Sequence, residues 1–292
     1  MMGILVALGV AIWIVIVWLA VGFTVLPARV TAERPLGPLL AAAAGVWAMQ
    51  AAVLVLGSLG WMRPATGWTL LVLGAGLALR VRNDLGSLAT AGWRWVVGRS
   101  QPAEIALILV TGAGLAASLV LSLIPPIGNM HGYQLALPDW YVRMGRIEPP
   151  PYTECFYFTQ AGEMIVYLGL LLFGEPFPGV MNWVLEIGLV GASAAAASGI
   201  GGRRAGLWTA AFVSTFPLVV RLALQSYVDY GLAASVVLAG AAGWRARATG
   251  DGAWAVLAGG LAGLAISFKY TGLMMAGIVV IDSRGRIEVF NA

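Results

Sequence analysis

Eight apolar runs, each close to the length of helix that crosses a lipid bilayer, dominate this sequence. About 20 helical residues span the hydrocarbon core, and a helix is favoured there because it satisfies its own backbone hydrogen bonds. Only 10% of the residues are charged, against roughly a quarter in a soluble domain. The sequence therefore predicts an all-α, polytopic transmembrane helical bundle. The runs occupy 3–26, 37–60, 65–80, 103–124, 178–199, 205–222, 229–244 and 252–268.

A shorter run at 159–174, which contains Glu163, brings the expected total to about eight or nine apolar helices. The positive-inside rule assigns arginine-rich connections to the cytoplasm, so such connections must share one side. They are 80–102, Arg203 with Arg204, and Arg245 with Arg247. An odd number of apolar runs separates the first two connections. We therefore expect 159–174 to be interfacial, re-entrant or oblique; otherwise Arg203 and Arg204 lie outside.

The small number of charged residues and the single cysteine exclude several classes of function. The formal net charge is +4, but the arginines are spread over short connections, so we expect no nucleic-acid partner. Cys155 is the only cysteine, which excludes an intramolecular disulfide and a zinc–thiolate cluster; we interpret it as a buried or idle thiol. The run from Gly3 to Val25 is longer than the apolar region of a signal peptide and should remain as a spanning helix.

We expect one helical membrane unit, which is divided into three regions. Residues 1–102 comprise N-terminal transmembrane helices and a cytoplasmic interfacial segment at 81–102, where arginines alternate with tryptophans and leucines. Residues 103–276 form a transmembrane core with an outer loop at 125–158, and residues 277–292 form a tail. The lipid bilayer is therefore the first expected partner.

Small residues are frequent in the apolar runs. Gly259 and Gly263 have the GxxxG spacing that predicts close approach of a neighbouring helix. The glycines do not indicate a nucleotide-binding loop, because they lie inside apolar runs without the strand that such a loop requires.

The outer loop contains an amphipathic, juxtamembrane segment at 135–145. Leu137, Trp140, Tyr141 and Met144 recur at helical spacing and form one apolar stripe. We expect this helix to lie on the membrane, with its two aromatic residues as interfacial anchors.

Three ionisable residues, in this segment or directly after it, lie off the stripe. They are Asp139, Arg143 and Arg146. The two guanidinium groups project toward the headgroups, where they either grip a phosphate or diphosphate or simply bind lipid headgroups.

Ionisable groups at the ends of spans are costly in a membrane and are therefore functional candidates. Asp229 begins an apolar run, where its carboxylate would act as a base, hold a cation or cap the helix. Lys269, the only lysine, follows the last run and either holds a lipid phosphate or snorkels to the headgroups. Glu186 lies one helical turn after Asn182, which favours a structural interhelical hydrogen bond.

The expected crossings place several of these candidates on one outward face. Asp139, Glu154, Asp229 and Lys269 then share the non-cytoplasmic side. His131 lies in the same outer loop and either lines a site or has a structural role. Because it is the only histidine, a metal site built from several histidines is excluded.

One string of the outer loop, from Asn129 to Ile147, reads Asn-Met-His-Gly-Tyr-Gln-Leu-Ala-Leu-Pro-Asp-Trp-Tyr-Val-Arg-Met-Gly-Arg-Ile. It resembles the first outer loop of bacterial GT-C superfamily glycosyltransferases of the family 39-like type. The typical string there is Asp-x-Leu-x-Tyr-His-Leu-x-x-Pro, followed by an aromatic helix that ends in Gly-x-Ile. Further similar strings, in the same order, are Gln160–Glu163, Tyr227–Tyr230 and Gly263–Gly272.

The resemblance implies a transferase of the bacterial inner (plasma) membrane that depends on a polyprenyl-phosphate sugar donor. Such an enzyme moves a hexose or pentose to a lipid, glycan or protein acceptor on the periplasmic or outer face. An outer-loop Asp of the family is thought to activate the acceptor or to orient the donor. The resemblance requires no cofactor and leaves a divalent cation open.

Two positions depart from the family pattern. Asn129 stands where the family has Asp, and Gln134 stands where it has His. An amide does not accept a proton as a carboxylate does. The resemblance therefore assigns the carboxylate to Asp139, Glu154 or Asp229, and Asp229 matches a second acidic position of the family. The other site candidates are Asn129 and His131 for catalysis, and Lys269, Arg143 and Arg146 for the lipid phosphate.

The tail from Gly277 to Ala292 resembles the opening strands of a PAS sensor domain, with strand-like alternation around an Asp-x-x-Gly turn. GT-C enzymes normally continue with several more spans, so we expect an incomplete or fused tail. The alternative function is a membrane-embedded sensor that feeds a cytoplasmic PAS or other output domain. A transporter is a third hypothesis for the function, and Glu186 is the main residue that favours it.

Overall fold

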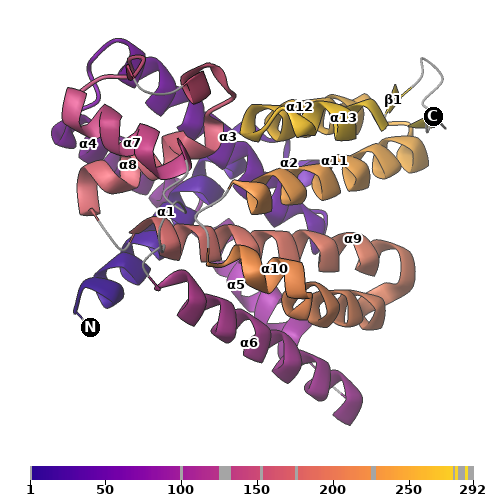
Figure 1. The fold of residues 1–292 in the computed structure, drawn as a ribbon. Helices are drawn as coiled ribbons and strands as arrows, with labels where there is room; N and C mark the ends of the chain where they lie inside the picture. Colours follow the sequence, from indigo (N-terminus) through magenta and orange to yellow (C-terminus); the bar gives the residue numbers. More distant parts are fainter. Residues whose placement is uncertain are drawn as a thin grey trace.

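The computed structural model describes residues 2–98, 101–124, 133–151, 154–174, 177–224, 228–278, 280–281 and 287–288. Helices form nearly all of the regular structure in this part of the chain, which confirms the all-α prediction (Figure 1). The strands β1 and β2 have two residues each and pair antiparallel near the C-terminus.

The elements follow one another in this order. The N-terminal helices are α1 (Met2–Val25), α2 (Ala28–Thr31), α3 (Leu36–Ser58), α4 (Pro64–Arg80) and α5 (Arg82–Val97). The central elements are α6 (Pro102–Ser122), α7 (Tyr133–Met144), the 3-10 helix η2 (Glu154–Tyr157), α8 (Ala161–Phe173) and α9 (Phe177–Thr215). The C-terminal elements are α10 (Pro217–Leu222), α11 (Asp229–Thr249), α12 (Gly252–Phe268), α13 (Thr271–Ile278), β1 (Val280–Ile281) and β2 (Ile287–Glu288).

Among the described residues, four helices are long and apolar enough to cross a membrane: α1, α3, α6 and α9. A fifth span results if α4 and α5, which are bent by 77°, count as one. The predicted total of eight or nine apolar helices that cross or enter the membrane is therefore not confirmed. α12 has 17 residues and α8 has 13, fewer than the roughly 20 that a crossing requires. The shortness of α8 agrees with the expectation that 159–174 does not cross.

The long helix α9 is broken at Gly201 and Gly202. Gly202 has φ 73° and ψ −178°, a conformation that glycine adopts without the steric cost that a Cβ would bring. The break separates the apolar runs 178–199 and 205–222, which the sequence predicts as two helices. Pro217 then starts α10 as a separate helix within the second run.

The arginine-rich connections predicted to share one side meet, together with 28–35, at one end of the bundle, here called the basic end (residues 28–35, 80–98, 101–104, 201–204 and 245–251). Arg203 forms an ion pair of 2.6 Å with Glu104 at the start of α6, and Arg204 donates to Gln101 Oε1 at 2.6 Å. The break in α9 is thereby fastened to the connection between α5 and α6. α5 itself is largely exposed, as an interfacial segment would be.

Two further ion pairs join the remaining connections to this end. Arg245, near the end of α11, pairs with Glu33 between α2 and α3. Arg29 of α2 pairs with Asp251, the N-cap of α12, at 3.0 Å. The prediction that the arginine-rich connections share one end of the bundle is confirmed.

The helices α1 and α3 pack in direct backbone contact. A Cβ built on Gly45 would overlap the backbone of Trp18, and one built on Gly22 would overlap the backbone of Ala41. Small residues allow such an approach where larger side chains would hold the helices apart. These two contacts fix the crossing of the first two long helices.

The prediction that a neighbouring helix packs closely against Gly259 and Gly263 is wrong. No atom of a neighbouring segment lies within 4 Å of a Cβ built on either glycine, and both residues are exposed. The buried face of α12 contains Trp254, Ala258 and Leu261 instead. The GxxxG spacing defines a face of a helix, but larger apolar residues on another face decide which side is buried.

Candidate functional site

Asp229 and Lys269 form an ion pair at the end of the bundle opposite the basic end. Asp229 is the first residue of α11, and Lys269 follows α12 in an extended conformation. A short turn at the basic end joins the two helices, so their other ends lie side by side (Figure 1). Lys269 Nζ donates to Asp229 Oδ1 at 3.0 Å, and the two side chains are 36% and 26% exposed. The fold thus joins two candidates that are 40 residues apart.

A second carboxylate, that of Glu163, lies near this pair in the first turn of α8. Its side chain is fully buried, and within the described residues neither carboxylate oxygen has a hydrogen-bond partner. α8 is not among the helices long enough to span a membrane. Burial raises the pKa of Glu163 to about 8, against smaller opposing effects, first of the backbone N–H of Glu163 itself and then of the Lys269 charge. The protonated form of Glu163 therefore predominates at neutral pH.

Close packing at Gly162 brings α8 against both neighbouring helix ends. A Cβ built on Gly162 would overlap the side chain of Val228 and approach that of Phe268 at 3.2 Å. Val228 directly precedes Asp229, and Phe268 directly precedes Lys269. Three elements, α8, α11 and α12, therefore supply the ionisable groups of what is here called the lysine end (Glu163, Asp229 and Lys269).

Aromatic residues tie the neighbouring loop to this end. The Tyr141 hydroxyl donates to Gln160 Oε1 at 2.5 Å, directly before α8. The Tyr270 hydroxyl donates to the Tyr157 carbonyl oxygen at 2.8 Å, and the rings of Tyr270 and Phe158 meet edge to face at 5.9 Å. The segment before α8 is therefore held on both sides, by α7 and by the residue that follows Lys269.

The predicted amphipathic helix exists as α7, but its apolar stripe packs mainly on protein. Leu137 and Tyr141 are fully buried, and the Tyr141 ring meets Tyr167 of α8 edge to face at 5.7 Å. Trp140 is partly buried and Met144 is 43% exposed. The expectation that Tyr141 is a membrane anchor is wrong, because α8 offers the stripe an apolar protein surface.

The charged side chains off this stripe pair with one another. Asp139 and Arg143 form an ion pair of 2.6 Å along α7, and both are at least half exposed. Arg146 pairs with Glu148 at 2.5 Å. Neither of these two ion pairs involves Asp229 or Lys269. The roles predicted for Asp139, Arg143 and Arg146 stay predictions.

Other predicted site residues lie outside the described part of the chain. Asn129 and His131 belong to the segment 125–132, which the structure does not describe. Glu154 begins η2, but its side chain and that of Cys155 are likewise outside the description. Their predicted roles stay predictions.

Glu186 has the structural role expected from the sequence. Ser118 Oγ of α6 donates to Glu186 Oε1 of α9 at 2.8 Å, and Glu186 is fully buried. Asn182, one turn earlier, donates to the Leu222 carbonyl oxygen at 3.2 Å. These bonds confirm that the face bearing Glu186 and Asn182 points into the bundle.

Glu163 is not among the site residues predicted from the sequence. There it served only as a reason why 159–174 should not cross the membrane. A lone carboxylate within an otherwise apolar run was the available signal, because such a residue is costly unless it has a function or a partner. What the sequence does not show is that Lys269 lies near enough to act on it.

Among the described residues, no group of three or more His, Cys, Asp and Glu side chains is placed to hold a metal ion. Comparison with known proteins found no matching family model, no matching curated protein and no matching solved structure. The chemistry open to this end of the bundle is therefore judged from its own residues.

Proposed function

We propose that this chain is a membrane glycosyltransferase of the GT-C type. It would move a sugar from a polyprenyl-phosphate-linked donor to an acceptor on the non-cytoplasmic face of a bacterial inner membrane. The observation that carries the proposal is the Asp229–Lys269 ion pair, with the buried carboxyl group of Glu163 near it. Because the arginine-rich connections lie at the opposite end, the positive-inside rule turns this pair outward.

The proposed reaction needs a base and a cation at the same place. The acceptor hydroxyl oxygen attacks the anomeric carbon of the sugar, and the bond from that carbon to the phosphate oxygen breaks. The polyprenyl phosphate leaves with the bonding electrons, and the hydroxyl proton passes to the base. A cation stabilises the charge on the departing phosphate. Asp229 fits the first role and Lys269 the second.

The ion pair implies an order for these events. Without substrate, Lys269 neutralises Asp229. A donor phosphate competes for the ammonium group, and its binding releases the Asp229 carboxylate to accept a proton. Glu163, held neutral by burial, adds no negative charge that would repel the phosphate.

The experiment is a donor-consumption assay on the purified chain in proteoliposomes. A panel of short-chain polyprenyl-phosphate hexoses and pentoses serves as donor, and mixtures of lipid, glycan and protein hydroxyl compounds are supplied as acceptors. Release of polyprenyl phosphate is the readout, because it reports transfer to any one of them. Asp229→Asn should lower the rate by a factor of about 10²–10⁴, because it removes the base. Membrane insertion and thermal stability should not change.

Asp251→Asn is the matched control for this variant. Asp251 lies at the basic end and caps α12, and asparagine is an equally good N-cap. Its rate should equal that of the wild type. Full activity in Asp229→Asn would exclude the proposed base, and absence of turnover with every donor in the wild type would contradict the transferase itself.

One observation favours the sensor as a second candidate. Two short strands of the tail pair with each other, Val280 with Glu288 and Ile281 with Ile287, in an antiparallel register. Such a hairpin is compatible with the opening of a PAS-like domain. The reading frame beyond Ala292 distinguishes the candidates: further apolar spans favour the enzyme, and a PAS domain with a kinase favours the sensor.

A further inference from the structure

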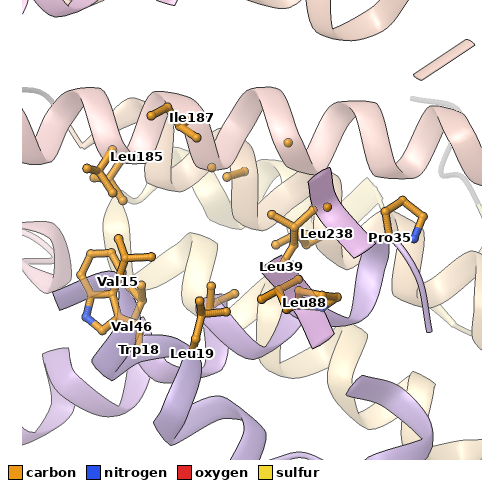
Figure 2. A pocket seen from close by; sticks show the side chains of 18 of the residues that line it. Val15, Trp18, Leu19, Pro35, Leu39, Val46, Leu88, Leu185, Ile187 and Leu238 are labelled. Carbon is orange, nitrogen blue, oxygen red and sulfur yellow. The ribbon is translucent and has the colours of Figure 1, made fainter. Parts of the chain in front are cut away.

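A large apolar cavity runs between the basic end and the lysine end. Its volume is about 1050 Å³, and residues of α1, α3, α5, α9, α11 and α12 line it. Figure 2 shows Val15, Leu39, Val46, Ile187 and Leu238 around it. Ligand pockets typically measure about 300–1,000 Å³, so this cavity is large enough for a sizeable ligand. Its walls accept hydrocarbon far better than a polar molecule.

The two ends of the cavity differ in charge. Phe268 and Gly231 line it near the lysine end, whereas Arg34 and Arg203 line it at the basic end. Arg203 is engaged by Glu104. Arg34 donates to the Ser87 hydroxyl at 3.2 Å, and no ion pair with a carboxylate of the described residues involves it. The mouth of the cavity at the basic end therefore carries a cation without a protein counter-ion in the described part of the chain.

Two further residues of the lining carry buried polar atoms without a hydrogen-bond partner among the described residues, namely Trp18 at its indole N–H and Ser198 at its hydroxyl. Both atoms are covered by the protein itself, so they are not presented to a ligand in the cavity. The surface that a ligand meets is therefore largely apolar apart from the arginines of the mouth.

We propose that this cavity binds an anionic phospholipid from the leaflet at the basic end. The acyl chains lie along the apolar walls, and the phosphate binds Arg34. Both features of such a lipid, the hydrocarbon and the negative charge, match groups of the cavity. The end of one acyl chain reaches Phe268, which directly precedes Lys269. Occupancy would thereby support the helix end that carries the lysine.

This lipid is distinct from the proposed sugar donor. The donor phosphate binds Lys269 at the opposite end of the bundle, whereas the cation of the cavity mouth is Arg34. The inference holds whether or not the chain transfers sugars, because it depends only on the cavity and on the charge of Arg34 at its mouth.

Lipid affinity of the purified full chain in detergent tests the charge. Phosphatidylglycerol and phosphatidylcholine with identical acyl chains are titrated, and bound lipid is counted by native mass spectrometry. The wild type should bind phosphatidylglycerol about tenfold more tightly, the factor expected for one charge-assisted contact. Arg34→Gln should abolish this preference. Arg247→Gln removes an arginine at the same end that does not line the cavity, and should retain it.

Filling the cavity tests the place of binding. Gly188 lines the cavity, and no atom lies within 4 Å of a Cβ built on it. Gly188→Leu should therefore enter empty space and weaken binding of both lipids about tenfold or more. Gly112→Leu, on the exposed face of α6 with equally open space, should bind like the wild type. Gly92→Leu, at a second open glycine of the cavity wall, replaces Gly188→Leu if that variant fails to fold.

Three outcomes would overturn the proposal. They are equal affinity of the wild type for the two lipids, a preference that survives Arg34→Gln, and unchanged binding in a cavity-filled variant that folds. Displacement of phosphatidylglycerol by a polyprenyl phosphate that itself needs Lys269 would assign the cavity to the donor instead. A dimer that excludes lipid would assign it to a second copy of the chain.

Discussion

The basic end and the lysine end of the bundle hold their charges in different ways. At the basic end, Arg29, Arg203 and Arg245 each pair with a carboxylate from a different connection. At the lysine end, Lys269 pairs with one carboxylate while another, Glu163, is buried without a hydrogen-bond partner among the described residues. The first arrangement fastens connections together. The second carries a desolvation cost that packing alone does not require, which is typical of a functional site.

After the loss of the base in Asp229→Asn, the largest effect is expected from removing the cation of the lysine end. Lys269→Met leaves Asp229 without its partner and the donor phosphate without its counter-charge. Donor consumption in proteoliposomes should fall by a factor of about 10²–10³, the usual result of losing one group that stabilises developing charge. Lys269→Arg keeps the charge and should recover part of the rate. Equal rates for Lys269→Met and the wild type would show that the pair is only structural.

The next effect concerns Glu163 and depends on pH. Its pKa is raised from 4.5 to about 8 in the folded state, so the folded chain keeps a proton that the unfolded chain loses between these values. The stability that this proton supports is present at low pH and is lost as the pH rises toward 8. The midpoint temperature of thermal unfolding in detergent should therefore decrease as the pH rises from about 4.5 to about 8, and should level off above this range.

Glu163→Gln should remove most of this slope, because glutamine does not titrate. At the alkaline end the variant should be the more stable protein, by an amount on the order of a few kcal/mol. Glu148→Gln, at an exposed ion pair near α7, serves as the control and should keep the wild-type slope. Parallel curves for Glu163→Gln and the wild type would mean that the Glu163 carboxyl group is solvated.

The basic end should respond more weakly, and its two kinds of ion pair should differ. Arg203→Gln leaves Glu104, whose side chain is only 12% exposed, without its charged partner, and should lower the unfolding free energy by more than Arg29→Gln does. Arg29→Gln breaks a pair whose arginine is 65% exposed, and should cost about 0–1 kcal/mol. Denaturant titration in detergent compares them. A larger loss for Arg29→Gln would contradict the burial argument.

Part of the fold follows from local patterns. Long apolar runs predict helices, and arginines between them predict which connections meet at one end; ion pairs such as Arg203–Glu104 confirm the second prediction. The hydrogen bond between Glu186 and a neighbouring helix was also predictable, because a buried carboxylate on a helix face needs a partner. Each of these inferences uses only residues within one segment or the count of segments between them.

Predictions that depend on which face of a helix meets a neighbour were less successful. Gly259 and Gly263 face outward although their spacing suits a close contact. Tyr141 packs on Tyr167 although its segment looks like a membrane-surface helix. In both cases an apolar stripe can be covered by lipid or by protein, and periodicity along one helix does not distinguish the two.

The sequence by itself determined that the chain is helical, that its arginine-rich connections meet at one end, and that Asp229 and Lys269 are ionisable residues at the ends of apolar runs. It did so because in an apolar environment a helix satisfies its own backbone hydrogen bonds, and a charge must stay near an end. Only the tertiary structure decided that these two residues form a pair, that Glu163 lies buried near them and that a cavity runs from Arg34 to Phe268. These features depend on distances between segments far apart in the chain, and such distances are set by how the helices pack.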